Sequence, residues 1–352
     1  MCGTCVTGEN RRTSPTPAMG RRGLLRGAMA GAALTTGLAA TRAEAAPANE
    51  RRSPDGLKLR WLGVAGWELT FDDHSILVDP YLSRQPYTKP NSGEIDPEMP
   101  LRPAARIVET VARDHLTKAP GLVLITHGHF DHLLDVPQLL GREGWKDATI
   151  RTLCSETHRH LLTAMDTDPV RLKHCITVSG GEHLRFPEGG SDQAPAYTVE
   201  VFRSLHSQLS GYGFFAPGHL VAPPARPTTL QHLLEGGSFG YQVTVGGDGP
   251  RVMFLSGTAN FAEREVAGAR PDVLVLGVSG HTGVHRYVER VMAALGNPPV
   301  VVPSHHDTML TELTSPGIGK TVNQAAVTGL RRIVEPLGAT VLEPRHLRTL
   351  SL

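Results

Sequence analysis

The chain has 352 residues, of which 40% are hydrophobic, and its formal net charge is +1. This is the composition of an ordinary globular protein, long enough for one large core or two modest domains. The nearly balanced charge provides no electrostatic footprint for nucleic acid, so we expect no nucleic-acid partner.

The N-terminal segment 1–46 resembles a twin-arginine export signal that is removed from the mature protein. Arg21-Arg22 precedes a mild Ala-, Gly- and Thr-rich stretch at 27–40, and Ala43-Glu44-Ala45 has the small-x-small pattern of a cleavage site. The alternative is a disordered tail with an accidental arginine pair. The apolar stretch is too short and too weak to span a bilayer. We therefore expect the twin-arginine export machinery as a partner, a periplasmic or extracellular location, and no stable membrane insertion.

The cysteines agree with removal of this segment. Cys2 and Cys5 would leave with it, so only Cys154 and Cys175 would stay in the mature chain. Neither belongs to a CxxC pair. They are either buried small residues or partners in a disulfide formed after export.

The mature part, 47–352, alternates strand-like and helix-like patterns. We expect strands at 57–71, 75–78, 122–125, 149–153, 175–178, 197–205, 241–245, 251–255, 272–278 and 300–302. We expect helices at 104–116, 133–140, 261–268, 284–295 and 320–335, and another that Ser155 opens. Strands and helices interleaved in this way indicate a layered α/β fold. Without internal repeats or a convincing linker, a single domain is the simpler prediction.

The segment 207–238 has no clear periodicity and contains several Gly and Pro residues with scattered Leu, Phe and Tyr. Loops of this length inside compact domains are usually functional lids or disordered segments. We predict a substrate-covering loop whose apolar residues favour a substrate with an apolar part. The alternative is a loop packed on its own core.

Three histidines and an aspartate follow the apolar run of "LVLITHGHFDHLLD", residues 122–135. The apolar run predicts a short buried strand. The side chains that follow its end, His127, His129, Asp131 and His132, are therefore expected to lie close together. Imidazole nitrogens are good zinc ligands at neutral pH, and a carboxylate suits a harder position. The alternative is a solvated histidine-rich loop. The spacing favours a metal site.

The pattern His127-x-His129-x-Asp131-His132 resembles the HxHxDH signature of the metallo-β-lactamase superfamily. The similarity continues in "WLGVAGWELTFDDHSILVDPYLS" (61–83), which resembles the opening hairpin of the lactonase-like and phospholipase-like branches. "GGEHLRF" (180–186) and "VFRSLHS" (201–207) also fall where that branch has them. The resemblance implies an α/β fold of the αββα sandwich type, with a binuclear metal site at one edge of the two sheets.

The resemblance also implies the distant ligands. The family's third histidine ends a downstream strand, where this chain has His206. Its last histidine stands two residues after a proline, which selects His305, with His306 as the competitor. One implied metal site is then formed by His127, His129 and His206. The other is formed by Asp131, His132 and His305.

One position departs from the family's pattern. The family has Gly-Asp after a strand, and this Asp bridges the two metals, whereas here Thr258 follows Gly257. Three protein ligands and a shared water still complete a tetrahedral shell at each site. Asp79 is either an acceptor that orients a ligand histidine or a strand-end turn residue. His281 either lines the pocket or belongs to a solvated loop.

The function implied is that of an exported, zinc-dependent hydrolase. Metal-activated water would attack an ester, lactone, amide or phosphodiester bond of a small-molecule substrate, and Asp131 would hold that water as the catalytic residue. One or two Zn²⁺ ions are expected, and Mn²⁺ or Fe²⁺ remains open. The alternative is a non-catalytic or single-metal binding protein on the same fold, because Thr258 replaces the bridging Asp.

Overall fold

The computed structural model describes residues 56–186, 194–208 and 210–352. The described residues belong to one compact unit. The predicted export signal at 1–46, with Cys2 and Cys5, lies outside the described residues, so it stays a prediction.

Among the described residues, the first sheet contains seven strands in the order β14-β1-β2-β3-β4-β5-β6. The strands β14, β1, β2 and β3 pair in antiparallel fashion, while β3 to β6 are parallel. Their bounds are β1 Lys58–Gly63, β2 Gly66–Phe71, β3 His74–Val78, β4 Leu122–Leu124, β5 Arg151–Cys154, β6 Cys175–Thr177 and β14 Thr349–Ser351.

The second sheet has the order β13-β12-β11-β10-β9-β8-β7. Here β7 to β10 are antiparallel and β10 to β13 are parallel. Their bounds are β7 His183–Phe186, β8 Tyr197–Arg203, β9 Phe239–Val245, β10 Arg251–Leu255, β11 Val273–Gly277, β12 Val300–Ser304 and β13 Thr340–Val341.

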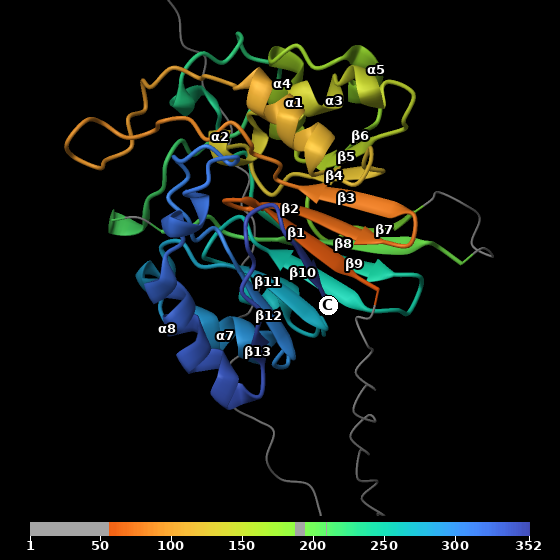
Figure 1. Ribbon diagram of the computed structural model, residues 1–352, viewed down its shortest axis with the longest axis vertical. Coiled ribbons are helices and arrows are strands. Elements are labelled where there is room, and N and C mark those ends of the chain that lie inside the picture. Colours follow the sequence, from red (N-terminus) through yellow and green to blue (C-terminus); the bar gives the residue numbers. More distant parts are fainter. Residues whose placement is uncertain (1–55, 187–193, 209) are drawn as a thin grey trace, which may run out of the picture. The chain divides into compact units, whose positions relative to one another are not determined.

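Helices cover the outer faces of both sheets, which makes a four-layered αββα arrangement (Figure 1). The helices α1, α3, α4 and α5 lie beside the first sheet, and α7 and α8 lie beside the second. The bounds are α1 Ala105–Asp114, α2 Phe130–Leu133, α3 Val136–Leu140, α4 Glu156–Ala164, α5 Pro169–Leu172, α6 Glu263–Val266, α7 Tyr287–Ala294 and α8 Gln324–Val334. The predicted αββα fold class is confirmed.

Three hydrophobic clusters hold these layers together. Trp61, Trp67 and Phe254 are fully buried in the cluster between the two sheets. A second cluster joins the first sheet to its helices, and a third joins the second sheet to α7 and α8. Because each sheet is covered on both faces, its central strands are apolar on both sides rather than alternating.

The structure corrects several predicted elements. The single strand expected at 57–71 is two strands, because Gly63 and Val64 both have positive φ and turn the chain between them. No alternation marked this break, since residues on both faces of the hairpin are buried. The short strands β7, β13 and β14 were missed, and the helix expected at 261–268 is the single turn α6.

The segment 207–238 contains no strand in its described part, which excludes residue 209, and has short 3₁₀ turns such as Leu230–His232. Leu230 and Leu233 are fully buried in the core beneath it, whereas Tyr212 and Val221 are exposed. Part of the loop is therefore anchored on the core, and part of it is free to face solvent. Whether it covers a substrate stays a prediction.

Two further expectations concern cysteine and the membrane. Cys154 and Cys175 are both free thiols, and Cys154 is buried. Within the described ranges, none of the helices combines the length and apolar character needed to cross a bilayer.

Candidate metal centre

The predicted ligands come from the ends of three strands and from the turn after one of them. His127 and His129 follow β4, and Asp131 and His132 lie on α2. His206 follows β8 of the other sheet, and His305 follows β12. The structure brings them together in two groups, and within each group the candidate ligand atoms all lie within 4.8 Å of one another. The first group consists of His127, His129 and His206, and the second of Asp131, His132 and His305.

The turn between the first two histidines requires glycine. The Gly128 N–H donates to the Glu235 carbonyl oxygen at 2.9 Å, and a Cβ atom added at this position would lie 2.2 Å from the Leu234 carbonyl oxygen. This backbone contact allows no larger residue without displacement. The backbone of the His127-Gly128-His129 turn therefore packs directly against the loop that precedes β9.

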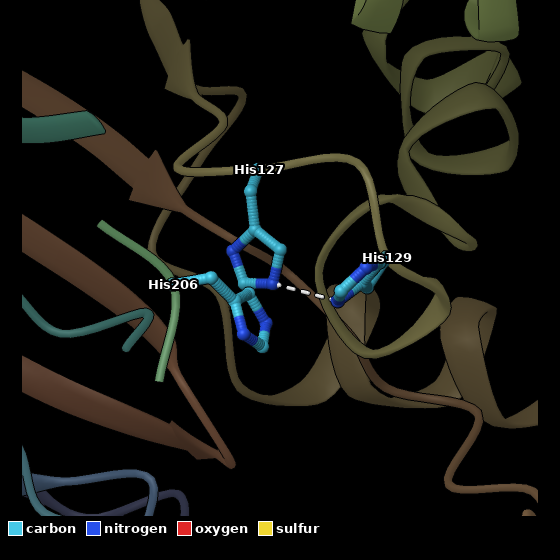
Figure 2. Close-up of side chains that lie close together, drawn as sticks. All are labelled: His127, His129 and His206. Carbon is cyan, nitrogen blue, oxygen red and sulfur yellow. Dashed lines mark hydrogen bonds between the residues drawn. The ribbon is translucent and has the colours of Figure 1, made fainter. Parts of the chain in front are cut away.

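The imidazoles of the first group face one another (Figure 2). His127 Nε2 lies 3.2 Å from His129 Nδ1. His206 Nδ1 lies 2.9 Å from the Ser207 carbonyl oxygen, which can only accept a hydrogen bond. The proton of a neutral His206 must therefore sit on Nδ1, which leaves the lone pair of Nε2 free.

Burial keeps this first group neutral. Burial, followed by the neighbouring histidines, holds the pKa of His127 well below its usual value and lowers that of His129 to about 3. Burial also lowers the pKa of His206. Neutral imidazoles are the form that binds metal, so these side chains need lose no proton to act as ligands.

The second group gathers around one carboxylate oxygen. Asp131 Oδ2 lies 3.3 Å from His132 Nε2 and 3.2 Å from His305 Nε2. Burial opposes the charge on His132, but Asp131 and Asp79 outweigh it and raise the pKa of His132 to about 10. Burial likewise opposes the charge on Asp131, and the two histidines hold its pKa well below the usual range. The group therefore combines one anionic and two nitrogen ligands.

Asp79 contacts His132 of the second group on the side of the ring away from Asp131, where a residue that orients a ligand histidine is expected. Its Oδ2 lies 2.8 Å from His132 Nδ1, and Oδ1 accepts from the Thr126 N–H at 2.7 Å. The Thr126 hydroxyl donates to Asp79 Oδ2 at 2.5 Å and lies 3.2 Å from His127 Nδ1. Sequence reasoning missed Thr126, because a threonine before a histidine has no distinctive pattern.

The two candidate histidines after β12 point to different places. His305 reaches Asp131, whereas the His306 ring stacks on Trp61 with ring centroids 4.4 Å apart and an interplanar angle of 9°. His306 is 3% exposed, and burial lowers its pKa to about 4. The geometry favours His305 as the ligand and places His306 in the packing around Trp61.

Thr258 and His281 lie beside the two groups without joining them. The Thr258 hydroxyl donates to the Leu205 carbonyl oxygen at 2.8 Å. His281 Nδ1 lies 2.7 Å from the Val278 carbonyl oxygen, and His281 lines a cavity of about 440 Å³ with His305. In the part of the chain that the structure describes, the two groups share no residue, and the Thr258 position offers no carboxylate between them.

The donor set fits divalent metal ions. Ring nitrogens of the first group lie 3.2 Å apart, and the second group places a carboxylate between two imidazole nitrogens, so both groups offer donor atoms that converge as metal ligands do. Three histidines, or two histidines and an aspartate, are ligand sets that zinc accepts with a position left open. The His132 contact to Asp79 is the kind of outer hydrogen bond that orients a ligand imidazole.

An αββα fold with two histidine-rich groups at one edge of its sheets defines a class of metal-dependent enzymes. A sequence profile of the beta-lactamase superfamily domain matches residues 58–305, more than half of the chain. The chain therefore belongs to the metallo-β-lactamase superfamily, and the predicted family is confirmed.

Individual relatives are distant. A UPF0173 metal-dependent hydrolase from Thermoplasma acidophilum is 24% identical over 258 residues, which cover 72% of this chain and 85% of the relative. Another from Methanopyrus kandleri is 32% identical over 88 residues, 25% of this chain and 28% of the relative. A solved metallo hydrolase from Ignicoccus hospitalis is 21% identical with a TM-score of 0.49, covering 84% of this chain and 99% of that one. A diiron beta-hydroxylase from Streptomyces venezuelae is 17% identical with a TM-score of 0.46, covering 85% and 55%.

Proposed function

We propose that this protein is a hydrolase that uses two metal ions, one in each group of ligands. The observation that carries this proposal is the convergence of two separate three-residue groups at one edge of the sheets. The relatives from Thermoplasma and Methanopyrus are named metal-dependent hydrolases, which supports the same reaction class. Zinc is the proposed metal because nitrogen ligands predominate, with five histidines and one aspartate.

A divalent ion held in such a site would lower the pKa of a bound water and polarise the carbonyl or phosphoryl oxygen of the centre under attack. The protein's own groups have separate tasks. Asp131, 7% exposed and ionised, would hold the attacking water by accepting a hydrogen bond. Asp79 and Thr126 keep the imidazole of His132 from rotating.

We propose that the substrate is a small molecule with an apolar part beside its ester, lactone, amide or phosphodiester bond. Phe214 stacks on the His206 ring with centroids 4.7 Å apart, and Phe215 meets the edge of the His129 ring at 5.5 Å. Leu205, the residue before His206, is 49% exposed. Aromatic side chains in contact with two proposed ligands provide an apolar wall against which an acyl group could pack.

Export through the twin-arginine route to the periplasm or the extracellular space remains part of the proposal. Its support is the sequence of residues 1–46 alone. Mass spectrometry of the protein recovered outside the cytoplasm is the direct test. An N-terminus near residue 47 supports export, and an intact N-terminus found only in the cytoplasm refutes it.

The central test is metal content per chain, measured together with hydrolysis of a panel of lactones, esters, amides and phosphodiesters. Wild-type protein is expected to hold two zinc ions. His305→Ala should retain one ion, whereas the matched control His281→Ala should retain two. Two ions in His305→Ala would contradict the assignment of the second group. Wild-type protein with one ion, rising to two in Thr258→Asp, would contradict the two-metal proposal and support the single-metal alternative.

A further inference from the structure

The stretch 205–208 carries His206 beyond the end of β8, where no neighbouring strand holds the backbone. The last backbone–backbone hydrogen bond before this stretch is donated by the Ser204 N–H to the Ser238 carbonyl oxygen, at 2.8 Å. Over the described ranges, residues 205–208 take part in no backbone–backbone hydrogen bond. The position of the His206 imidazole must therefore be set by side-chain contacts.

Residues 258–260, which follow β10, supply these contacts. The Thr258 hydroxyl donates to the Leu205 carbonyl oxygen at 2.8 Å. The Asn260 side-chain amide donates to the His206 carbonyl oxygen at 3.0 Å. The two side chains therefore hold the carbonyl groups of His206 and of the residue before it. We call residues 258–260 the clamp.

A third contact of the clamp reaches the residue after His206. The Ala259 N–H donates to Ser207 Oγ at 2.7 Å. The Ser207 carbonyl oxygen accepts from His206 Nδ1 at 2.9 Å, which fixes the tautomer of the proposed ligand. Three successive residues are therefore held, and the last of them also orients the imidazole.

The clamp itself is rigidly supported. Thr258 and Asn260 are each only 6% exposed. The Thr258 carbonyl oxygen accepts from the Tyr287 hydroxyl at 3.4 Å, and Asn260 Oδ1 accepts from the Phe261 N–H at 2.9 Å. The Gly277 backbone lies close against the Thr258 carbonyl group, since a Cβ atom added at Gly277 would lie 2.6 Å from its oxygen. Because these supporting residues are closely packed, the clamp restricts the movement of the backbone at residues 205–207.

We propose that Thr258 is a positioning residue: through the clamp it holds His206 in the orientation in which Nε2 faces His127 and His129. The inference rests on the proposed function, because a metal ion is what these three histidines would share. It assigns a task to the position where the superfamily's pattern has a bridging carboxylate. An ionised carboxylate cannot donate to the Leu205 carbonyl, so one side chain cannot both bridge two metals and donate this hydrogen bond.

The test compares Thr258→Val, which removes the hydroxyl at nearly constant shape, with Thr258→Ser, which retains it. The matched control is Thr157→Val, because Thr157 is also buried and its Oγ1 accepts from the Leu220 N–H at 2.9 Å. Stepwise Zn²⁺ affinity is measured by competition with a chromophoric chelator. The visible spectrum of the Co²⁺ form and thermal unfolding of the metal-free protein are recorded alongside.

Thr258→Val should weaken one of the two binding steps by about 10-fold or more and change the Co²⁺ spectrum, in line with losses seen when outer partners of metal ligands are removed. Thr258→Ser should stay within about 2-fold of wild type, as a retained hydroxyl predicts. The control should lose stability without a change in metal affinity. Equal Zn²⁺ affinity in wild type and Thr258→Val would overturn the proposal, and so would an equal loss in the control.

A second variant covers the case in which Thr258→Val does not fold. Thr258→Ala removes the same hydroxyl and leaves a smaller, unbranched side chain, and it should weaken the same binding step. Unchanged Zn²⁺ affinity in Thr258→Ala would then overturn the proposal. Failure of the proposed function is distinguishable, since a wild type that binds two ions but hydrolyses no substrate leaves all these affinity comparisons valid.

Discussion

Replacing Asp307 by asparagine should destabilise the fold strongly, because Asp307 is the centre of a buried charge network. Its Oδ2 accepts from Arg84 Nη1 at 2.9 Å and from His346 Nε2 at 2.7 Å, and the Val64 N–H lies 3.3 Å away. The side chains of Asp307 and Arg84 are both 0% exposed. The network joins the β1–β2 turn to the segment that follows His305.

The expected loss follows from the absence of solvent around this pair. Removing one partner of a fully buried ion pair leaves an uncompensated charge, which costs about 3–5 kcal/mol. The asparagine keeps the shape of the side chain but leaves the Arg84 guanidinium unpaired. Glu263→Gln is the control, because its pair with Arg290 is 2.7 Å long but both side chains are more than one-third exposed. An exposed pair contributes about 0–1 kcal/mol.

Urea unfolding of the metal-free proteins, followed by tryptophan fluorescence, measures both losses. Burial opposes the charge on Asp307, but the hydrogen bond from His346 and the charge of Arg84 hold the pKa of this carboxyl well below its usual range. A lowered folded pKa stabilises the protein above the unfolded value near 3.8, and this contribution is lost as the pH falls further. The advantage of wild type over Asp307→Asn should therefore shrink below about pH 4. A loss under about 1 kcal/mol at pH 7, or a pH-independent one, would refute the reasoning.

Three further predictions concern the site. Gly128→Ala should cost about 1–3 kcal/mol in urea unfolding, since its Cβ would strike the Leu234 carbonyl oxygen. Asp79→Asn should weaken one Zn²⁺ binding step about 10–100-fold in chelator competition, since the carboxylate no longer orients His132. Binding of metal to the second group should release about one proton at pH 7, because the pKa of His132 is raised to about 10 without metal. Calorimetry in buffers of different ionisation enthalpy measures that release.

Each of these predictions has an outcome that contradicts it. Wild-type stability in Gly128→Ala would mean that the backbone contact has room to relax. Unchanged affinity in Asp79→Asn would mean that Thr126 or packing alone orients the imidazole. Metal binding without proton release would mean that His132 is neutral before the ion arrives.

The sequence alone was sufficient for the local part of the metal centre and for the fold class. His127, His129, Asp131 and His132 lie within six consecutive positions after an apolar strand, so their proximity depends on local chain geometry. The layered α/β arrangement was likewise readable, because buried strands and amphipathic helices leave periodic patterns of apolar residues. Both features depend on residues that are close together in the sequence, so the sequence alone predicts them.

The distant ligands His206 and His305 were predicted only through the family resemblance, and the tertiary structure supplies the contacts that place them beside this cluster. It turned His305 toward Asp131 and His306 onto Trp61, although both stand after the same strand. It brought Thr258 against the backbone next to His206, a contact between segments more than fifty residues apart that no local pattern marks. The physical reason is that these residues come from two different sheets. Their relative positions are set by the close packing of many apolar side chains between the sheets, and no short stretch of sequence contains that information.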